Sequence, residues 1–128
     1  MQGLEKWHVA VKNRDLNVLD EILAEDVVFY SPVVWKAQHG KDITKLYLSA
    51  AMFVLANEDF KYEREIVSGN RACLEFSTKV EETIINGVDI ITFNDEGKII
   101  EFKVMVRPLR AMMTLKEKML ELMQKMSG

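Results

Sequence analysis

The spacing of apolar residues changes at Phe60, from the period of about 3.6 residues typical of a helix to the period of two typical of a strand. Before Phe60, three segments at residues 4–11, 16–23 and 43–54 place apolar side chains at helical spacing. After it, four strand-like segments follow one another. Helices followed by strands predict an α+β fold, in which three N-terminal helices pack on one face of a curved, mainly antiparallel sheet.

Turn residues separate the four strand-like segments. They are Ser68-Gly69-Asn70, Asn86-Gly87 and the polar residues 94–97. Asn86-Gly87 is the strongest of these signals, because both residues tolerate the positive φ that a tight hairpin turn requires. We therefore expect a β-hairpin to turn at Asn86-Gly87, with antiparallel pairing on both sides of it.

Two residue patterns mark where elements of the first third begin and end. Asp15 is positioned to cap a helix over residues 16–23, by accepting a backbone N–H group of its first turn. A short strand over residues 27–30 is expected to stop at Ser31-Pro32, since proline cannot continue the hydrogen-bond ladder.

Residues 108–128 form a methionine-rich extension. Thr114 followed by Glu117 is typical of a capping box and predicts the start of a last helix. The apolar stripe of this helix consists of Leu115, Met119, Leu122, Met123 and Met126. Such a soft apolar surface favours packing over the mouth of the fold or against a second subunit, and a groove for a protein partner is the alternative.

Alternation within the strands predicts which side chains point inward. In residues 71–81 and 98–107, apolar and polar side chains alternate, so one sheet face is apolar and the other carries charges of both signs. Asp89 and Arg64 share the parity of apolar neighbours, and an acid in an apolar strand needs a partner, a proton or water. Asp89 is thus either a solvated residue just past the turn or a pocket carboxyl. Arg64 either reaches solvent from the sheet rim or faces inward.

Composition excludes several classes of function. The net charge is −3 and the basic residues are interleaved with acids, which argues against nucleic acid as a partner. No segment approaches the ~20 apolar residues of a membrane span and the N-terminus lacks a signal-peptide core, so we expect a cytoplasmic protein without a membrane partner. Cys73 cannot form an internal disulfide and the two histidines lack metal-ligand spacing, so we expect neither metal nor cofactor. A chain of 128 residues is expected to form one domain, 1–128.

The order of elements and several short motifs together resemble a known family. The motifs are Arg14-Asp15-Leu16, the run at residues 24–29, Gly40-Lys41-Asp42-Ile43, the hairpin at residues 89–99 and Val106-Arg107-Pro108. Over residues 4–108 the chain resembles the nuclear transport factor 2-like superfamily, and within it the SnoaL-like proteins, kin to ketosteroid isomerases and polyketide cyclases. The resemblance implies a cone-like α+β barrel, usually a homodimer through the exposed sheet face, with a pocket between helices and sheet.

The resemblance also implies a test for steroid isomerisation. Ketosteroid isomerases carry a tyrosine on the first helix, an aspartate before the proline that ends the first strand, and an aspartate in the next-to-last strand. The matching positions here are Trp7, Ser31 and Asp89. Asp89 fits that pattern, whereas the hydroxyl of Ser31 does not abstract a carbon-bound proton at useful rates. The departure at Ser31 argues against isomerisation by that mechanism.

The candidates for proton transfer are Asp89, His39 and Tyr30. By the resemblance His39 lies at the pocket mouth, where a histidine would titrate near neutral pH. Tyr30 and Trp35 lie in the same segment and either face the ligand or pack under the loop. We expect the ligand pocket to include Trp7, Ser31, Trp35, Phe53, Arg64, Ile91, Phe93, Phe102 and Val104.

Three functional hypotheses follow. The first is an isomerase, cyclase or hydratase of a small apolar molecule, in which burial raises the pKa of Asp89 and His39 or Tyr30 is its proton partner. The second is a non-catalytic binder of such a molecule, which the missing base at Ser31 favours. The third is a protein-association module that uses the sheet face or the last helix.

Overall fold

The computed structural model describes residues 2–127, with side chains up to residue 126, so the predicted domain limits 1 and 128 lie outside it. Its helices are α1 (Gln2–Asn13), α2 (Leu16–Ile22), α3 (Lys41–Leu55) and α4 (Leu109–Ser127). Its strands are β1 (Leu23–Tyr30), β2 (Gln38–His39), β3 (Lys61–Ser68), β4 (Arg71–Val80), β5 (Thr83–Phe93) and β6 (Ile99–Arg107). None of these helices combines the length and apolar character needed to cross a membrane.

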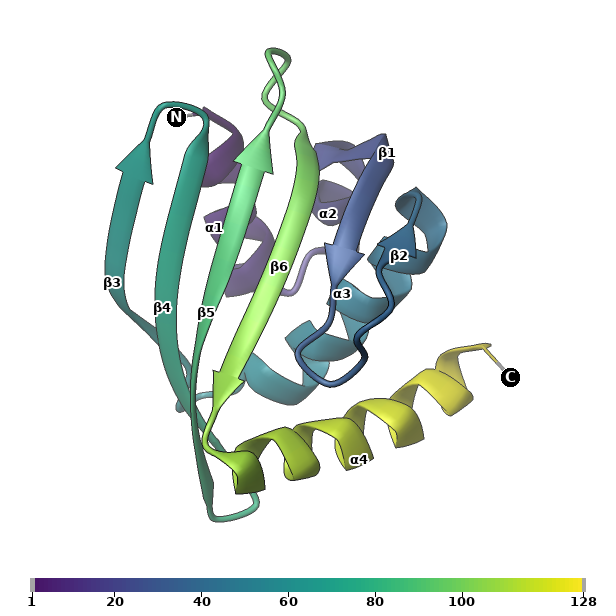
Figure 1. Ribbon diagram of the computed structural model, residues 1–128, viewed down its shortest axis with the longest axis vertical. Helices are drawn as coiled ribbons and strands as arrows, with labels where there is room; N and C mark the ends of the chain where they lie inside the picture. Colours follow the sequence, from purple (N-terminus) through teal and green to yellow (C-terminus); the bar gives the residue numbers. More distant parts are fainter. Residues whose placement is uncertain (1, 128) are drawn as a thin grey trace.

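The strands form one curved sheet in the order β2-β1-β6-β5-β4-β3. Neighbouring strands pair antiparallel, except that β1 runs parallel to β6. Figure 1 shows α1, α2 and α3 on one face of the sheet, and α4 crossing the end of the sheet where β6 finishes. The predicted α+β class is confirmed, with three N-terminal helices on a curved, mainly antiparallel sheet and a last helix after it. The sheet curls around the helices and stays open, with β2 and β3 as its edges.

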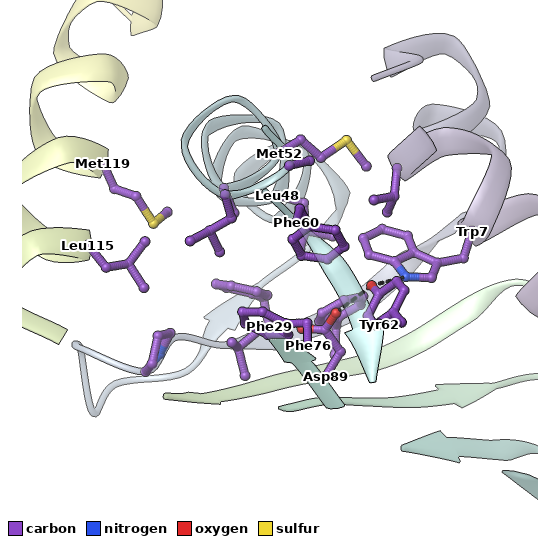
Figure 2. A pocket seen from close by; sticks show the side chains of 17 residues that line it. Trp7, Phe29, Leu48, Met52, Phe60, Tyr62, Phe76, Asp89, Leu115 and Met119 are labelled. Atoms are coloured by element: carbon purple, nitrogen blue, oxygen red, sulfur yellow. Dashed lines mark hydrogen bonds between the residues drawn. The ribbon is translucent and has the colours of Figure 1, made fainter. Parts of the chain in front are cut away.

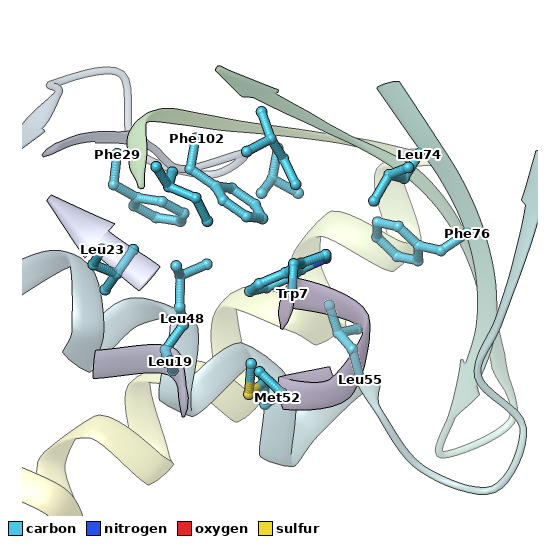
Figure 3. Close-up of a cluster of buried hydrophobic side chains, with 14 of the residues drawn as sticks. Trp7, Leu19, Leu23, Phe29, Leu48, Met52, Leu55, Leu74, Phe76 and Phe102 are labelled. Carbon is cyan, nitrogen blue, oxygen red and sulfur yellow. The ribbon is translucent and has the colours of Figure 1, made fainter. Parts of the chain in front are cut away.

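The hydrophobic core fills the space between the helices and the inner face of the sheet (Figure 3). Trp7 of α1 meets Phe102 of β6 edge-on, with 4.9 Å between the ring centroids. Phe76 of β4 is also fully buried in this cluster. The alternation predicted in residues 71–81 is confirmed, because the predicted inward side chains are the more buried ones in β4. In residues 98–107 it holds from Phe102 onward but is wrong at Ile100. A β-bulge at the start of β6 makes Ile99 the fully buried residue in its place.

The predicted start of the second helix and the predicted end of the first strand are confirmed, whereas β1 begins at Leu23, within the segment expected to be helical, and not at residue 27. The carboxylate of Asp15 caps α2 by accepting hydrogen bonds from the backbone N–H groups of Asn17 at 3.0 Å and Val18 at 3.2 Å. β1 ends at Tyr30, directly before Ser31-Pro32.

The last helix begins earlier than predicted. α4 starts at Leu109, immediately after Pro108, and the backbone N–H of Met112 donates to the carbonyl of Pro108 at 3.2 Å. Thr114 therefore lies within the helix, and its hydroxyl lies 3.3 Å from that of Thr83 instead of capping a helix end. The prediction of a capping box at Thr114 was therefore wrong, because the helix has already begun five residues earlier at Leu109.

The hairpin turn predicted at Asn86-Gly87 is also wrong, because both residues lie within β5 and pair with β4. The chain turns instead at Glu81-Glu82, which have φ values of 47° and 67°. Gly87 serves a different purpose, since a Cβ atom there would lie 2.5 Å from Cζ of Phe76. Glycine is required here for the close approach of a core ring and not for a turn.

Candidate functional site

A pocket lies between the inner face of the sheet and helices α1, α3 and α4 (Figure 2). Its cavity has a volume of about 50 Å³, more than the ~15 Å³ that one water needs. Almost all of its lining is apolar and includes Phe29, Leu48, Phe60, Phe76, Leu115 and Met119. Three lining side chains carry polar atoms: Trp7, Tyr62 and Asp89. The chemistry of the pocket therefore depends on these three groups.

The three polar groups form a hydrogen-bonded chain with one direction. Nε1 of Trp7 donates to the hydroxyl oxygen of Tyr62 at 3.0 Å, and that hydroxyl donates to Oδ2 of Asp89 at 2.8 Å. An indole N–H can only donate, so the proton of the Tyr62 hydroxyl is left to point toward the carboxyl group. Among the described residues, Tyr62 is the one hydrogen-bond partner of the Asp89 carboxyl group. The second oxygen of Asp89 is thus available to a ligand.

The fold brings these three hydrogen-bonded side chains together from three separate elements. Asp89 lies in the middle of β5, where strand parity turns it inward between Gly87 and Ile91. Tyr62 comes from β3, just before a β-bulge, and Trp7 comes from the buried side of α1. The inward orientation predicted for Asp89 from alternation is what places its carboxyl group against the other two.

Burial sets the protonation of the two acidic groups. It raises the pKa of Asp89 to about 7, because no cation compensates the buried charge, and the hydrogen bond from Tyr62 opposes part of this rise. Burial, followed by the nearby charge of Asp89, raises the pKa of Tyr62 well above its usual value. Near neutral pH, Asp89 therefore exists in both forms while Tyr62 keeps its proton. In its protonated form Asp89 becomes a hydrogen-bond donor at the end of the chain.

The family sequence model of the SnoaL-like domain matches residues 4–102, which is most of the chain. The chain belongs to the SnoaL-like family. This confirms the resemblance drawn from the order and spacing of its motifs. The family match ends within β6, so helix α4 lies beyond it.

Solved structures support the same assignment. A steroid delta-isomerase from Pseudomonas aeruginosa is 36% identical with a TM-score of 0.91, and the match covers 99% of this chain and 93% of that one. A protein with a cystatin-like fold from Silicibacter pomeroyi DSS-3 is 33% identical with a TM-score of 0.85, over 93% and 83% of the two chains. The epoxide hydrolase/cyclase-like enzyme SalBIII shares the fold at 16% identity and a TM-score of 0.68, over 83% and 88%. No curated protein matches the chain by sequence.

Some of the residues predicted for the pocket of this SnoaL-like chain line the cavity, and others are buried elsewhere in the core. Trp7, Phe102 and Val104 contribute directly to the lining. Ile91 and Phe93 are fully buried on the same strand as Asp89 but lie outside the lining, and Phe93 packs beneath Gly3 of α1. The structure thus brings Asp89 together with Trp7, Phe102 and Val104.

The end of β1 and the segment after it place their predicted site residues away from the pocket. The hydroxyl of Ser31 accepts a hydrogen bond from the backbone N–H of Val33 at 3.1 Å, which makes it a turn residue. The side chain of Trp35 is 99% exposed, and His39 is exposed on β2 at the sheet edge. Tyr30 lies at the end of β1 with Nζ of Lys103 4.8 Å from its ring centroid. None of the four lines the cavity.

Arg64 and Phe53 also lie outside the pocket. A β-bulge between Tyr62 and Arg64 shifts the parity of β3, so Arg64 lies on the outer sheet face and its Nε pairs with Glu75 at 2.8 Å. Phe53 is 45% exposed, and its ring centroid lies 5.7 Å from Cζ of the Arg14 guanidinium. A bulge reverses strand parity without a signal in the sequence, so alternation placed Arg64 on the wrong face.

The outer face of the sheet has a different character from the pocket. Arg64, Glu75, Met105 and Arg107 border a shallow depression there of about 340 Å³. The homodimer expected through this face stays a prediction. Within residues 2–127, no three His, Cys, Asp or Glu side chains come together as a metal site would require.

Tyr62, Leu115 and Met119 are pocket residues that were not selected from the sequence. The sequence did indicate that Tyr62 faces inward, since it alternates with Phe60 in the first strand-like segment after the helices. Leu115 and Met119 were recognised as part of an apolar helical stripe, and nothing in that stripe distinguishes a pocket wall from ordinary packing.

Proposed function

We propose that the protein binds a small, largely apolar molecule that carries one hydrogen-bond-accepting group, such as a ketone. Protonated Asp89 donates a hydrogen bond to that group. The observation that carries this proposal is the direction of the chain from Trp7 through Tyr62 to Asp89, in a pocket whose other lining is almost wholly apolar. The neutral carboxyl group is the last donor of that chain, so a ligand that offers an acceptor completes it.

The chemistry of the pocket favours a neutral acceptor over an anionic group. An anionic ligand would lose its hydration without a buried cation to compensate its charge, at a large free-energy cost. A ketone oxygen needs one donor and has an apolar body that suits the lining. Because the pKa of Asp89 is raised to about 7, we expect ketone binding to weaken as the pH rises through 7.

The binding test compares two ligands of nearly equal shape, cyclopentanone and methylenecyclopentane, the second of which lacks the oxygen. The indole N–H resonance of Trp7 reports on pocket occupancy, and that of the exposed Trp35 is an internal control. At pH 6 we expect a preference for the ketone of about fivefold, the worth of one net hydrogen bond, and at pH 8.5 no preference. Asp89→Asn should keep the preference at both pH values, since its amide donates throughout. A ketone preference that is absent at pH 6, or independent of pH in the wild-type protein, contradicts the proposal.

A second candidate is proton transfer at carbon, in which Asp89 is the base. It is favoured by the similarity to the Pseudomonas aeruginosa steroid delta-isomerase and by a pKa of about 7, which suits a catalytic carboxylate. The Asp89 carboxylate would take a proton from the carbon beside a ketone, forming an enolate, and return a proton to carbon. With Ser31 in a turn, Asp89 would be the base as well as the returning acid.

The two functions have opposite pH dependence. Binding through a neutral Asp89 is strongest below pH 7, whereas base catalysis requires the ionised form and grows as the pH rises through 7. The exchange of the α-hydrogens of cyclopentanone for deuterium in heavy water measures the second. Exchange that Asp89→Asn abolishes would establish catalysis. Exchange at the same rate with wild-type protein, variant and buffer would exclude this reaction and leave binding.

A further inference from the structure

We propose that α4 sets the upper size of the ligand, so that the pocket accepts a compact molecule of about one ring and excludes a multi-ring molecule such as a steroid. This inference rests on the proposed function and adds the class of ligand to it. The residues responsible are Leu115 and Met119, which close the pocket at the end away from Asp89.

Leu115 and Met119 form one wall of the pocket. They lie four residues apart on α4, so both point to the same side of the helix. Leu115 is 1% exposed and Met119 is 6% exposed, and both line the cavity. Figure 2 shows them on one side of the pocket, with Trp7, Tyr62 and Asp89 on the other. A ligand whose acceptor meets Asp89 would therefore extend toward these two side chains.

This wall is anchored to the body of the protein. Nζ of Lys118 lies 2.9 Å from a carboxylate oxygen of Glu81, and the hydroxyl of Thr114 lies 3.3 Å from that of Thr83. Both contacts join the first half of α4 to the turn between β4 and β5 and the strand that follows it. Ala111, fully buried, packs this part of the helix against the core. The burial of Ala111 and Leu115, together with these two contacts, holds this part of α4 on the body of the protein. Met119 is the adjustable part of the wall, because a methionine side chain is flexible.

The size of the cavity supports a compact ligand. Its volume of about 50 Å³ is below the ~150 Å³ of a cavity that holds benzene and far below the ~300–1,000 Å³ of pockets for larger molecules. Movement of the Met119 side chain can make room for one ring. Room for several rings would require α4 itself to leave its anchors at Glu81 and Thr83.

The test measures how substitutions at Met119 change the preference between cyclopentanone and the two-ring ketone 2-decalone, at pH 6, with the Trp7 indole resonance as the readout. The steroid androst-4-ene-3,17-dione is a third ligand. We expect wild-type protein to bind cyclopentanone and not the steroid. Met119→Ala should raise the affinity for 2-decalone by about tenfold or more relative to cyclopentanone, since each methylene fitted into an apolar pocket is worth about that much.

The control is Met113→Ala, which removes the same side chain from an exposed position of α4 and should leave the preference unchanged. Met119→Val removes less volume and should move the preference in the same direction, which keeps the test valid where Met119→Ala unfolds. If ketones bind but the preference is equal in all variants, or wild-type protein binds the steroid as tightly as cyclopentanone, this inference is overturned and the proposed function stands. If neither the wild-type protein nor any variant binds a ketone, both this inference and the proposed function are overturned.

Discussion

Two carboxyl groups on adjacent strands, Asp89 and Glu75, face opposite sides of the same sheet. Glu75 on the outer face pairs with Nε of Arg64 at 2.8 Å and accepts a hydrogen bond from the side chain of Asn86 at 3.1 Å. The Asn86 amide in turn accepts from Arg107 at 3.4 Å. Asp89 on the inner face is buried, has a phenol as its partner and has no cation near it.

The difference shows two ways of keeping an acid in a β-sheet. On the outer face, solvent and an arginine compensate a charged carboxylate. On the inner face, the carboxyl group is buried and has no arginine beside it, so it retains its proton up to about pH 7. A retained proton is also a donor that can meet a ligand, so the same lack of compensation that costs stability provides the chemistry of the pocket.

The largest effect expected from this difference is on the pH dependence of stability. The pKa of Asp89 is raised in the folded protein from 3.8 to about 7, so the folded state binds the proton more tightly and the free energy of unfolding falls as the pH rises through this range. Asp89→Asn removes that titration. Between pH 5 and pH 8, we expect the unfolding free energy of the variant to gain about 3 kcal/mol on that of the wild-type protein.

Urea unfolding of wild-type protein, Asp89→Asn and Glu75→Gln at both pH values measures this effect. Glu75→Gln is the matched control from the outer face. It should change the unfolding free energy by less than ~1 kcal/mol, since the ion pair between Glu75 and the exposed Arg64 is accessible to solvent. If the unfolding free energies of Asp89→Asn and wild-type protein differ by the same amount at pH 5 and pH 8, the pKa of Asp89 is not raised by burial.

The inner face should also resist added volume. Gly87→Ala would place a Cβ atom 2.5 Å from Cζ of Phe76 and 2.9 Å from the carbonyl oxygen of Met105. We expect a loss of about 2 kcal/mol of unfolding free energy, because overpacking forces core side chains and backbone to shift. Urea unfolding checks this, and a variant as stable as wild-type protein would show that the Phe76 ring has room to move.

Tyr62→Phe removes the middle of the hydrogen-bonded chain and leaves Trp7 and Asp89 without their partner. We expect it to cost about 1–2 kcal/mol, the price of unsatisfied buried polar groups. The hydrogen bond from Tyr62 lowers the pKa of Asp89, so its loss should move the carboxyl titration to a higher pH. A carboxyl titration by NMR measures this shift, and a movement to lower pH would mean that Tyr62 does not donate to Asp89.

The smallest effect is expected on the outer face. Arg64→Ala breaks an ion pair whose arginine side chain is 71% exposed, so the loss of unfolding free energy should be below ~1 kcal/mol. The titration of Asp89 and the affinity for cyclopentanone should not change, since Arg64 lies on the other side of the sheet. A change in either would mean that the charge of Arg64 influences the pocket through the sheet.

Periodicity made much of the fold predictable. The change of apolar spacing at Phe60 separates helices from strands, and parity correctly turned Asp89 inward because β5 is regular around it. Asn86-Gly87 misled the prediction, since its composition is that of a turn while its role is to admit the ring of Phe76. That requirement comes from another strand and cannot be seen locally.

The site was harder to predict than the fold. Tyr62 meets Asp89 although the two lie far apart in the sequence, and only the assembled sheet brings them together. The residues expected from the segment after β1, such as His39 and Trp35, lie in a short edge strand and a loop whose path has no periodic signal. The carboxyl group itself was the predictable part of the site, because a buried acid in an apolar strand already requires an explanation.

The protonation of the buried Asp89 carboxyl group is measured directly by its titration, followed by NMR of the ¹³C-labelled side-chain carbon and assigned with Asp89→Asn. We predict a midpoint near pH 7, in agreement with the pKa of about 7 that burial produces. A midpoint near 4, the ordinary value for an aspartate, would mean that the carboxyl group is ionised and solvated. It would then hold no proton to offer a ligand at neutral pH.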